Sequence, residues 1–536
     1  ADDFSYRASV SAILQEGLVI NSDNQKYIAR IRATQKALDD KLTLALNLNN
    51  TNEKSNWSPT GVGRADFRSN LISNAYVAKP TDPVLDGDGN YFYDENVFQY
   101  INPYAVAQEV VNEGSANNLF GSLDADLELT EALTLGWFGS WRKVDRNSGY
   151  FAPYKSTLPV PRDYNGIANV NTNLQDEKLM NMTLNYKETF DKHRIKFDGL
   201  YEWQKQTYQG HFAQGRDFIN DITSYHALQL GSVEDVLPGD ISSYKNDRKL
   251  VSFMGRLNYS FDNKYILTAS FRRDGSSVFG TDHKWGNFPS ASLAWRVTQE
   301  PFMEDQDLFS NLKLRVGYGV TGNQQGLYPQ QSKQLVGASG QVYFNGELIT
   351  NFAVTQNANE DLRWETRYQT NVGIDFGMLG GRLSGSLDAF VATTENLLFN
   401  YSVPQPPFPH GSIVANACIL KYEGIELSLD YKAINTEDLM LSLGGNVSLL
   451  RNEVLSLSGS IDGVPLNTNY VGMGYDAFLI EGEPIGTFNI LEHSGKDANN
   501  EETVVDRNDD GIIDQGARSP DRYMAGSALP TYTFAF

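Results

Sequence analysis

The chain alternates apolar and polar residues along many separate stretches. Between Val251 and Phe261, for example, every second residue is apolar or glycine. Successive side chains of a β-strand point to opposite faces, so this period of two gives one apolar face and one polar face. Because the pattern recurs along almost the whole chain, we expect about 15 or 16 strands. A membrane β-barrel needs this pattern from end to end, with lipid outside its wall and water inside.

The segments between the expected strands come in two sizes. Short ones hold turn residues, such as Gly380-Gly381, whereas long ones run over residues 50–118, 210–248, 323–360 and 400–422. Short turns on one side and long loops on the other are typical of outer-membrane barrels. A β-propeller would instead repeat a blade motif about every 40–50 residues, and the sequence shows no such repeat.

The composition narrows the possible functions. The formal net charge is −22, which makes a nucleic-acid partner improbable because phosphates are also negative. Cys418 is the only cysteine, which excludes a disulfide framework and a cysteine-rich zinc site. Aromatic residues make up 12% of the chain, in keeping with the aromatic girdles of a barrel.

The sequence contains no apolar run of about 18 residues, so we expect no transmembrane helix. A barrel strand spans the membrane with about 9–11 residues, and its alternation keeps the mean hydropathy low. The expected fold class is therefore all-β, a transmembrane antiparallel β-barrel with long extracellular loops. Stacked soluble sandwiches are the alternative, since any single amphipathic strand could face solvent with its polar side.

Several segments resemble the SusC/RagA-type outer-membrane transporters, a branch of the TonB-dependent receptors. The similarity extends over essentially the whole chain, and its motifs follow the family in order and spacing. They are the segments 255–260, 264–277, 284–290, 293–296, 312–323, 423–427, 482–488 and 506–514.

The resemblance implies a 22-stranded barrel, an N-terminal plug with an energy-coupling box, and a SusD-like surface lipoprotein that acts as a lid. It also implies import across the outer membrane of a Gram-negative bacterium, powered by the TonB-ExbB-ExbD complex through the plug. Against this pattern, residues 1–536 are expected to be one partial barrel domain, without a plug and without the last strands.

Three tryptophans lie at expected strand ends or in loops: Trp57, Trp285 and Trp364. An exposed aromatic ring there would stack on a sugar ring, whose C–H face matches a π-surface. Packing within the loops is the alternative for each of them.

An acidic loop contains Asp506, Asn508, Asp510 and Asp514, with Gly511 at the sixth position. This spacing resembles the first part of a calcium loop, in which alternating oxygens wrap a hard cation. The twelfth position is Ala517, where an EF-hand needs a bidentate glutamate. An Asx-rich turn without an ion is the alternative, and no other cofactor is expected.

The sequence thus predicts a transporter rather than an enzyme. The expected cargo is an oligosaccharide, and oligopeptide import by the same mechanism is one alternative. A soluble, β-rich carbohydrate-binding protein at the cell surface is the other.

Overall fold

A computed structural model describes residues 3–57, 71–94, 102–154, 164–461, 464–466, 470–474, 476–516 and 519–536. The chain divides into two compact units. The first comprises Ala1–Thr183, Glu202–Leu250 and Val336–Ala353, and the second comprises Leu184–Tyr201, Val251–Leu335 and Val354–Phe536. Each unit is described by itself.

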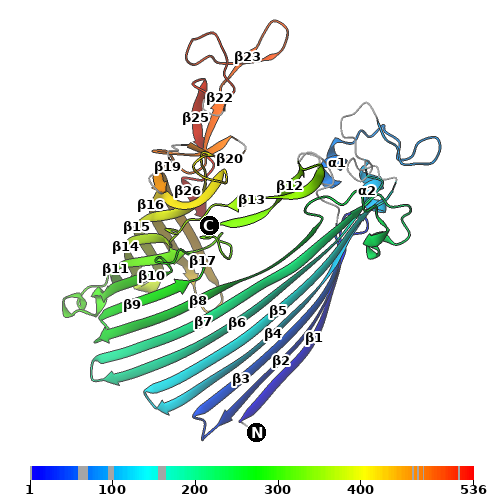
Figure 1. Ribbon diagram of the computed structural model, residues 1–536. Helices are drawn as coiled ribbons and strands as arrows, with labels where there is room; N and C mark the ends of the chain where they lie inside the picture. The colour runs from blue at the N-terminus through cyan, green and yellow to red at the C-terminus, as the bar shows by residue number, and fades with distance from the viewer. Residues whose placement is uncertain are drawn as a thin grey trace. The chain divides into compact units, whose positions relative to one another are not determined.

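Most strands belong to one sheet of sixteen strands within the described part of the chain, and each strand whose register is known is antiparallel to its neighbour. Figure 1 shows β1 to β5 side by side as long arrows. In sheet order the strands are β1 (Phe4–Glu16), β2 (Asp23–Ala37), β3 (Leu42–Asn56), β4 (Val111–Thr130), β5 (Leu133–Ala152), β6 (Ile167–Phe190), β7 (His193–Arg216), β8 (Ile241–Phe261), β9 (Tyr265–Ser276), β10 (Trp285–Arg296), β11 (Phe309–Asn323), β14 (Glu365–Met378), β15 (Leu383–Ser402), β16 (Ser412–Asn435), β17 (Met440–Ser456) and β26 (Tyr532–Ala535).

The remaining elements are short and lie in the connections. Three hairpins are β12 (Leu335–Phe344) with β13 (Glu347–Gln356), β18 (Gly459–Ile461) with β19 (Val464–Leu466), and β23 (His493–Lys496) with β24 (Glu502–Val504). A four-stranded sheet holds β20 (Tyr470–Gly474), β21 (Ala477–Ile480), β22 (Thr487–Leu491) and β25 (Arg522–Ser527). The helices are α1 (Leu71–Val77), α2 (Pro103–Glu109), η2 (Ser224–His226), η3 (Leu228–Leu230), η4 (Val297–Gln299), η5 (Pro301–Met303) and η6 (Leu379–Gly381). In the part of the chain that the structure describes, no helix is long and apolar enough to cross a membrane.

Many strands are longer than the alternation predicts. β6 and β7 have 24 residues each, and β3 and β4 extend into the segment 50–118, which the sequence predicts to be a loop. The two ends of this loop prediction were therefore wrong. Both faces of these strand ends are polar, so the alternation fades there although the backbone ladder continues through them.

The strand register of the first unit sorts residues into rows across β2 to β5. One face carries apolar rows, such as Ile31, Leu48, Gly121 and Trp141. The opposite face carries polar rows, such as Arg32, Asn47, Ser122 and Ser140. The predicted two-faced strands are confirmed here.

The second unit shows the same division. An apolar row runs through Leu314, Ile374, Leu387, Leu427 and Val447, and each of these side chains lies directly opposite the next. The other face holds charged and hydroxyl side chains, including Arg315, Asp388 and Glu426. Several side chains of the apolar face, such as Leu387 and Val447, are exposed, so no described residue covers the face at these positions.

Buried clusters lie near strand ends rather than in a central core. Leu71, Val106 and Ala107 pack with Ala152 in the first unit. In the second unit, β15 and β16 contribute to two further clusters, which include Tyr401, Ile413 and Cys418. These clusters fix the long connections against the strands.

Candidate functional site

The polar face of the second unit holds an ion-pair network. Arg315 bonds to Asp375 on β14 (Nη2 to Oδ1, 2.7 Å) and to Asp388 on β15 (Nη1 to Oδ1, 2.9 Å). Lys313 adds a second cation to Asp375, at 2.6 Å. Gly373 leaves room for this network, because a Cβ at that position would lie 2.3 Å from Asp388 Oδ1 and 2.7 Å from Arg315 Nη2. Two cations and two carboxylates thus neutralise one another across three strands.

The polar face of the first unit is rich in amide and hydroxyl groups. Asn47 donates to the Ser122 hydroxyl at 3.3 Å on this face. The other face also carries amides near the strand ends, where Asn117 donates to Asn52 at 2.7 Å. Near the strand ends, Lys26 pairs with Glu53 at 3.3 Å. Such neutral donors and acceptors suit ligands with many hydroxyl groups.

Trp57 lies on the polar face, directly after β3. Its backbone N–H donates to the Asn112 carbonyl at 2.8 Å, which continues the ladder between β3 and β4 by one residue. The indole covers Gly114, where a Cβ would lie 2.4 Å from the ring. The side chain remains 46% exposed, so one ring surface is open for stacking.

Trp285 lies instead on the apolar face. It stands opposite Gly275, in the same face as the Trp295–Tyr265 and Pro289–Phe271 pairs. Phe253 stacks beside the Trp285 ring, with centroids 6.3 Å apart. The guanidinium of Arg273 lies 5.2 Å from the ring centroid. An aromatic ring with a cation above it at the edge of an apolar band is typical of a membrane-interface anchor.

Trp364 is buried, with 7% of its surface exposed. Its ring packs against Phe279 at 4.7 Å and against Phe288 at 5.5 Å, and its Nε1 donates to the Lys284 carbonyl at 2.9 Å. Trp364 therefore packs within its loop, as the alternative interpretation of the sequence expected, and it offers no ring surface to a ligand. Of the three tryptophans, only Trp57 lies exposed on the polar face.

The acidic loop forms a turn held by its own side chains. Asp506 accepts hydrogen bonds from the backbone of Asp510 (3.3 Å) and Gly511 (2.7 Å), and Asn508 donates to Asp510 at 2.8 Å. Asp514 accepts from the Gly516 N–H at 2.8 Å. Ala517 lies outside the described residues. Among the residues that are described, no three His, Cys, Asp or Glu side chains form a metal-binding group. Calcium binding by Asp506, Asn508, Asp510 and Asp514 stays a prediction.

A buried ion pair closes the connection between β7 and β8. Arg216 at the end of β7 bonds to both carboxylate oxygens of Asp240, which also accepts from the Leu237 N–H at 2.6 Å and from Gln214 at 3.1 Å. Arg216 also donates to the Asp235 carbonyl at 3.1 Å. Burial acts to raise the pKa of Asp240, but the bonds from Arg216 and Leu237 outweigh it and hold the pKa below its usual range.

The first unit contains a polar pocket of about 490 Å³ that the sequence does not predict. Its wall includes Asp23, Lys54 and Glu113, which lie on the same face as the apolar rows but closer to the strand ends. Tyr225, from η2, covers Gly149 and donates to the Glu113 carboxylate. Burial and this hydrogen bond raise the pKa of Tyr225 to about 12. Because β5 and the Tyr225 connection are far apart in sequence, no local pattern indicates this pocket.

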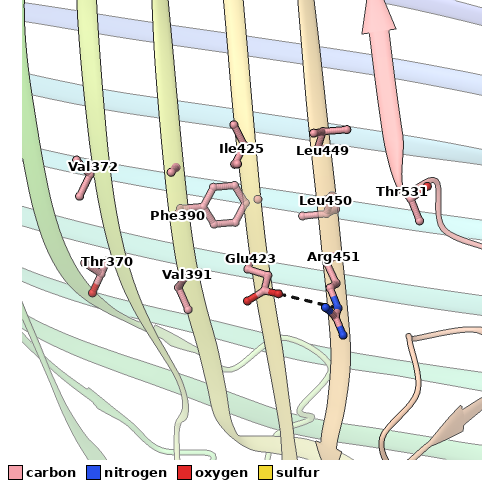
Figure 2. Close-up of a pocket in the computed structure, with 12 residues that line it drawn as sticks. Thr370, Val372, Phe390, Val391, Glu423, Ile425, Leu449, Leu450, Arg451 and Thr531 are labelled. Atoms are coloured by element: carbon pink, nitrogen blue, oxygen red, sulfur yellow. Dashed lines mark ion pairs between the residues drawn. The ribbon is translucent and has the colours of Figure 1, made fainter.

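A second pocket, of about 550 Å³, lies in the second unit (Figure 2). Figure 2 shows Val372 on β14, Ile425 on β16 and Leu449 on β17, with the Glu423–Arg451 ion pair next to Ile425 and Leu449. These two charged side chains are 3.9 Å apart. Val372, Ile425 and Leu449 belong to one apolar row, so the pocket is a hollow in the apolar face and not in the polar face.

A family model described as "TonB dependent receptor-like, beta-barrel" matches residues 22–533. Two curated relatives show similarity over nearly the same length. "TonB-dependent receptor P3" of Formosa agariphila is 29% identical over 92% of this chain and 49% of its own length. "TonB-dependent receptor SusC" of Bacteroides thetaiotaomicron is 25% identical over 98% of this chain and 53% of its own. The chain thus spans about half the length of these curated relatives.

Solved structures of similar fold include the RagAB peptide transporter. One such chain matches 99% of this chain and 58% of its own length, with a TM-score of 0.78 and 20% sequence identity. A structure of RagAB in the open-open state gives a TM-score of 0.79, again at 20% identity. At this identity the match establishes the fold, an antiparallel transmembrane β-barrel, as the sequence predicted.

Proposed function

The chain belongs to the TonB-dependent receptor β-barrel family, and from this premise we propose that it forms the wall of an outer-membrane importer for oligosaccharides. Membership confirms the predicted resemblance, and it agrees with the prediction of a transporter rather than an enzyme. The observation that carries the proposal is the two-faced sheet. Its apolar rows suit lipid, and its polar rows suit a water-filled passage for a hydrophilic cargo.

The proposed location is the outer membrane of a Gram-negative bacterium. Exposed apolar side chains follow one another along the strands of the second unit, as in Leu387 and Val391 of β15. An apolar surface of this extent would be unfavourable in water, because monomeric soluble proteins expose only small apolar patches. This argument disfavours the alternative of a soluble surface protein.

Two features of the polar face favour a sugar as cargo. Trp57 offers an exposed ring at the end of β3, and the rows below it are rich in asparagine, serine and threonine. An aromatic platform next to amide and hydroxyl groups is the combination that pyranose rings use, through C–H contacts and hydrogen bonds. Oligopeptide import is the second candidate, because a structure of similar fold is described as a peptide transporter.

The proposed mechanism needs partners that lie outside residues 1–536. A SusD-like lipoprotein would hold the cargo as a lid, and the TonB-ExbB-ExbD complex would supply energy through a plug domain. The chain's own contribution would be the polar wall along which the cargo passes. The negative net charge of −22 disfavours nucleic acid as a cargo.

Binding by the detergent-purified full-length protein tests this proposal. The probes would be neutral oligosaccharides and oligopeptides of matched size, titrated by calorimetry. We expect saccharide binding that weakens about two- to tenfold in Trp57→Ala, since a stacked ring contributes about 0.5–1.5 kcal/mol. Trp364→Phe would be the control, because Trp364 is buried. Binding of peptides alone would refute the oligosaccharide proposal in favour of the second candidate.

A further inference from the structure

Four arginines lie in two adjacent rows on the polar face of the first unit. Arg30 and Arg142 share one row across β2 to β5, and Arg7 and Arg32 share the next row across β1 and β2. We refer to Arg7, Arg30, Arg32 and Arg142 as the arginine patch. The other members of its two rows are Ser9, Asn47, Asn49, Phe120, Ser122 and Ser140, so the two rows contain no carboxylate.

The charges of the arginine patch are not compensated by described residues. Arg7, Arg30 and Arg32 are exposed, and none of them forms an ion pair or hydrogen bond within the described ranges. Arg142 only donates to the Asn118 side chain, at 3.3 Å. Within β1 to β5, the row next to Arg7 and Arg32 holds Asp124, and Glu53, already paired with Lys26, lies two rows from Arg30 on the other side. In a chain of net charge −22 this is a local excess of four positive charges.

The patch also contains an unfavourable pair. Arg7 on β1 lies directly opposite Arg32 on β2, in register. Like charges in directly opposite positions destabilise an antiparallel pair. The Arg315 network of the second unit shows that this protein elsewhere places carboxylates beside its wall arginines.

The apolar residues behind the arginine patch strengthen its electrostatic field. Arg30 and Arg32 flank Ile31, which belongs to an apolar row on the opposite face. The arginines therefore line a polar face whose back is apolar, and low-dielectric walls focus the field of charges of one sign. Guanidinium groups bind carboxylates and sulfates through paired N–H donors.

We propose that the arginine patch is a binding site for negatively charged groups of the cargo, so that the importer prefers oligosaccharides bearing carboxylates or sulfate esters. This inference rests on the proposed function and specifies its substrate class. The amide and hydroxyl groups of Asn47, Asn49 and Ser122 would then bind the neutral hydroxyls of the same sugar chain.

The test compares matched probes on the detergent-purified full-length protein. Oligogalacturonate is titrated against its methyl ester, and an oligosaccharide of sulfated galactan against its desulfated form, at low and at high salt. We expect each anionic probe to bind at least about tenfold more tightly than its neutral form at low salt, since a charge-assisted bond is worth about 1.5–3 kcal/mol. The preference should shrink as salt is raised.

Arg30→Gln and the double variant Arg7→Gln/Arg32→Gln remove charge and keep hydrogen-bonding capacity. We expect each to weaken binding of the anionic probes about tenfold and to change binding of the neutral probes less than about twofold. Arg256→Gln is the matched control. Arg256 is an exposed arginine on the polar side of β8, lies outside the patch and forms no ion pair with any described residue. Its substitution should leave the preference unchanged.

Thermal stability gives a readout that does not depend on cargo. Arg7→Gln relieves the Arg7–Arg32 repulsion, so the ligand-free protein should unfold at the same or a higher temperature. A lower unfolding temperature, with no change in probe preference, would show that the arginines bind another part of the protein and would overturn the proposal. Equal binding of anionic and neutral saccharides would also overturn it, while leaving oligosaccharide import intact. Binding of no saccharide at all would instead refute the proposed function.

Discussion

Substitution of Asp240 by asparagine tests how the β7–β8 connection is held closed. Asp240 is 4% exposed and its ion-pair partner Arg216 is 9% exposed. Asparagine keeps the shape of the side chain but leaves the Arg216 charge buried without a counter-ion. Removing one partner of a buried ion pair costs about 3–5 kcal/mol.

This cost should appear as local opening of residues 217–239, because the ion pair joins the two ends of that segment. A change of about 3–5 kcal/mol raises the open population about a hundred-fold to a few thousand-fold. Amide hydrogen exchange of the detergent-solubilised protein would measure it. Faster exchange is expected at Gly231 and Ser232, whose N–H groups bond to Leu228 and Arg216 carbonyls.

Glu234→Gln is the control, since it removes one charge from an exposed position in the same segment. The pair Arg216→Met/Asp240→Leu should restore most of the protection, because an apolar pair replaces two buried charges. Equal exchange in Asp240→Asn and Glu234→Gln would refute the assigned role of the ion pair. In the unmodified protein the pKa of Asp240 is lowered. Its ionised carboxylate therefore stabilises the closed connection at neutral pH, and this stabilisation is lost only as pH falls below about 4.

Three further predictions concern other residues. Burial and the neighbouring Asp221 raise the pKa of Glu109 to about 7. The folded state therefore holds the Glu109 carboxyl proton more tightly than the unfolded state does. Protection of α2 from amide hydrogen exchange should fall as pH rises from about 4.5 to about 7, and Glu109→Gln should abolish this pH dependence. Gly373→Ala should displace Arg315 from Asp388 and lower the unfolding temperature, at a cost of about 1–3 kcal/mol. Gly319→Ala on β11 is the control, because its Cβ would meet only Ser290 Cβ at 3.6 Å, and it should leave Arg315 and the unfolding temperature unchanged. Trp364→Ala should destabilise the packing around Phe279 and Phe288 by about 3–5 kcal/mol in denaturant titrations, and an unchanged midpoint would contradict its burial.

The sequence predicted those parts of the fold whose signal is local. Successive side chains of a strand such as β17 point to opposite faces, so a period of two in the local sequence reveals both the strand and its apolar face. The end of a strand is less visible. In β3 the residues after Leu48 are polar on both faces, so the pattern stopped while the strand continued to Asn56.

The candidate site was harder to predict because it depends on which face of the sheet each single side chain occupies. Trp57 and Trp285 both stand at strand ends in the sequence, yet Trp57 lies on the polar face and Trp285 on the apolar face. The arginine patch needs the register of β1 with β2, which places Arg7 beside Arg32 although 25 positions separate them. Hydrogen-bonded register is a long-range property, and a single sequence does not specify it for two neighbouring polar strands.

Uptake by living cells is the most direct test of import through this protein. Cells with and without the gene would be given a labelled oligosaccharide, and label in the periplasm would be measured with and without a protonophore. If the protein is a TonB-driven importer, uptake requires the gene and stops when the proton gradient is collapsed, since TonB draws its energy from that gradient. Uptake that persists without the gene, or that the protonophore does not affect, would contradict it.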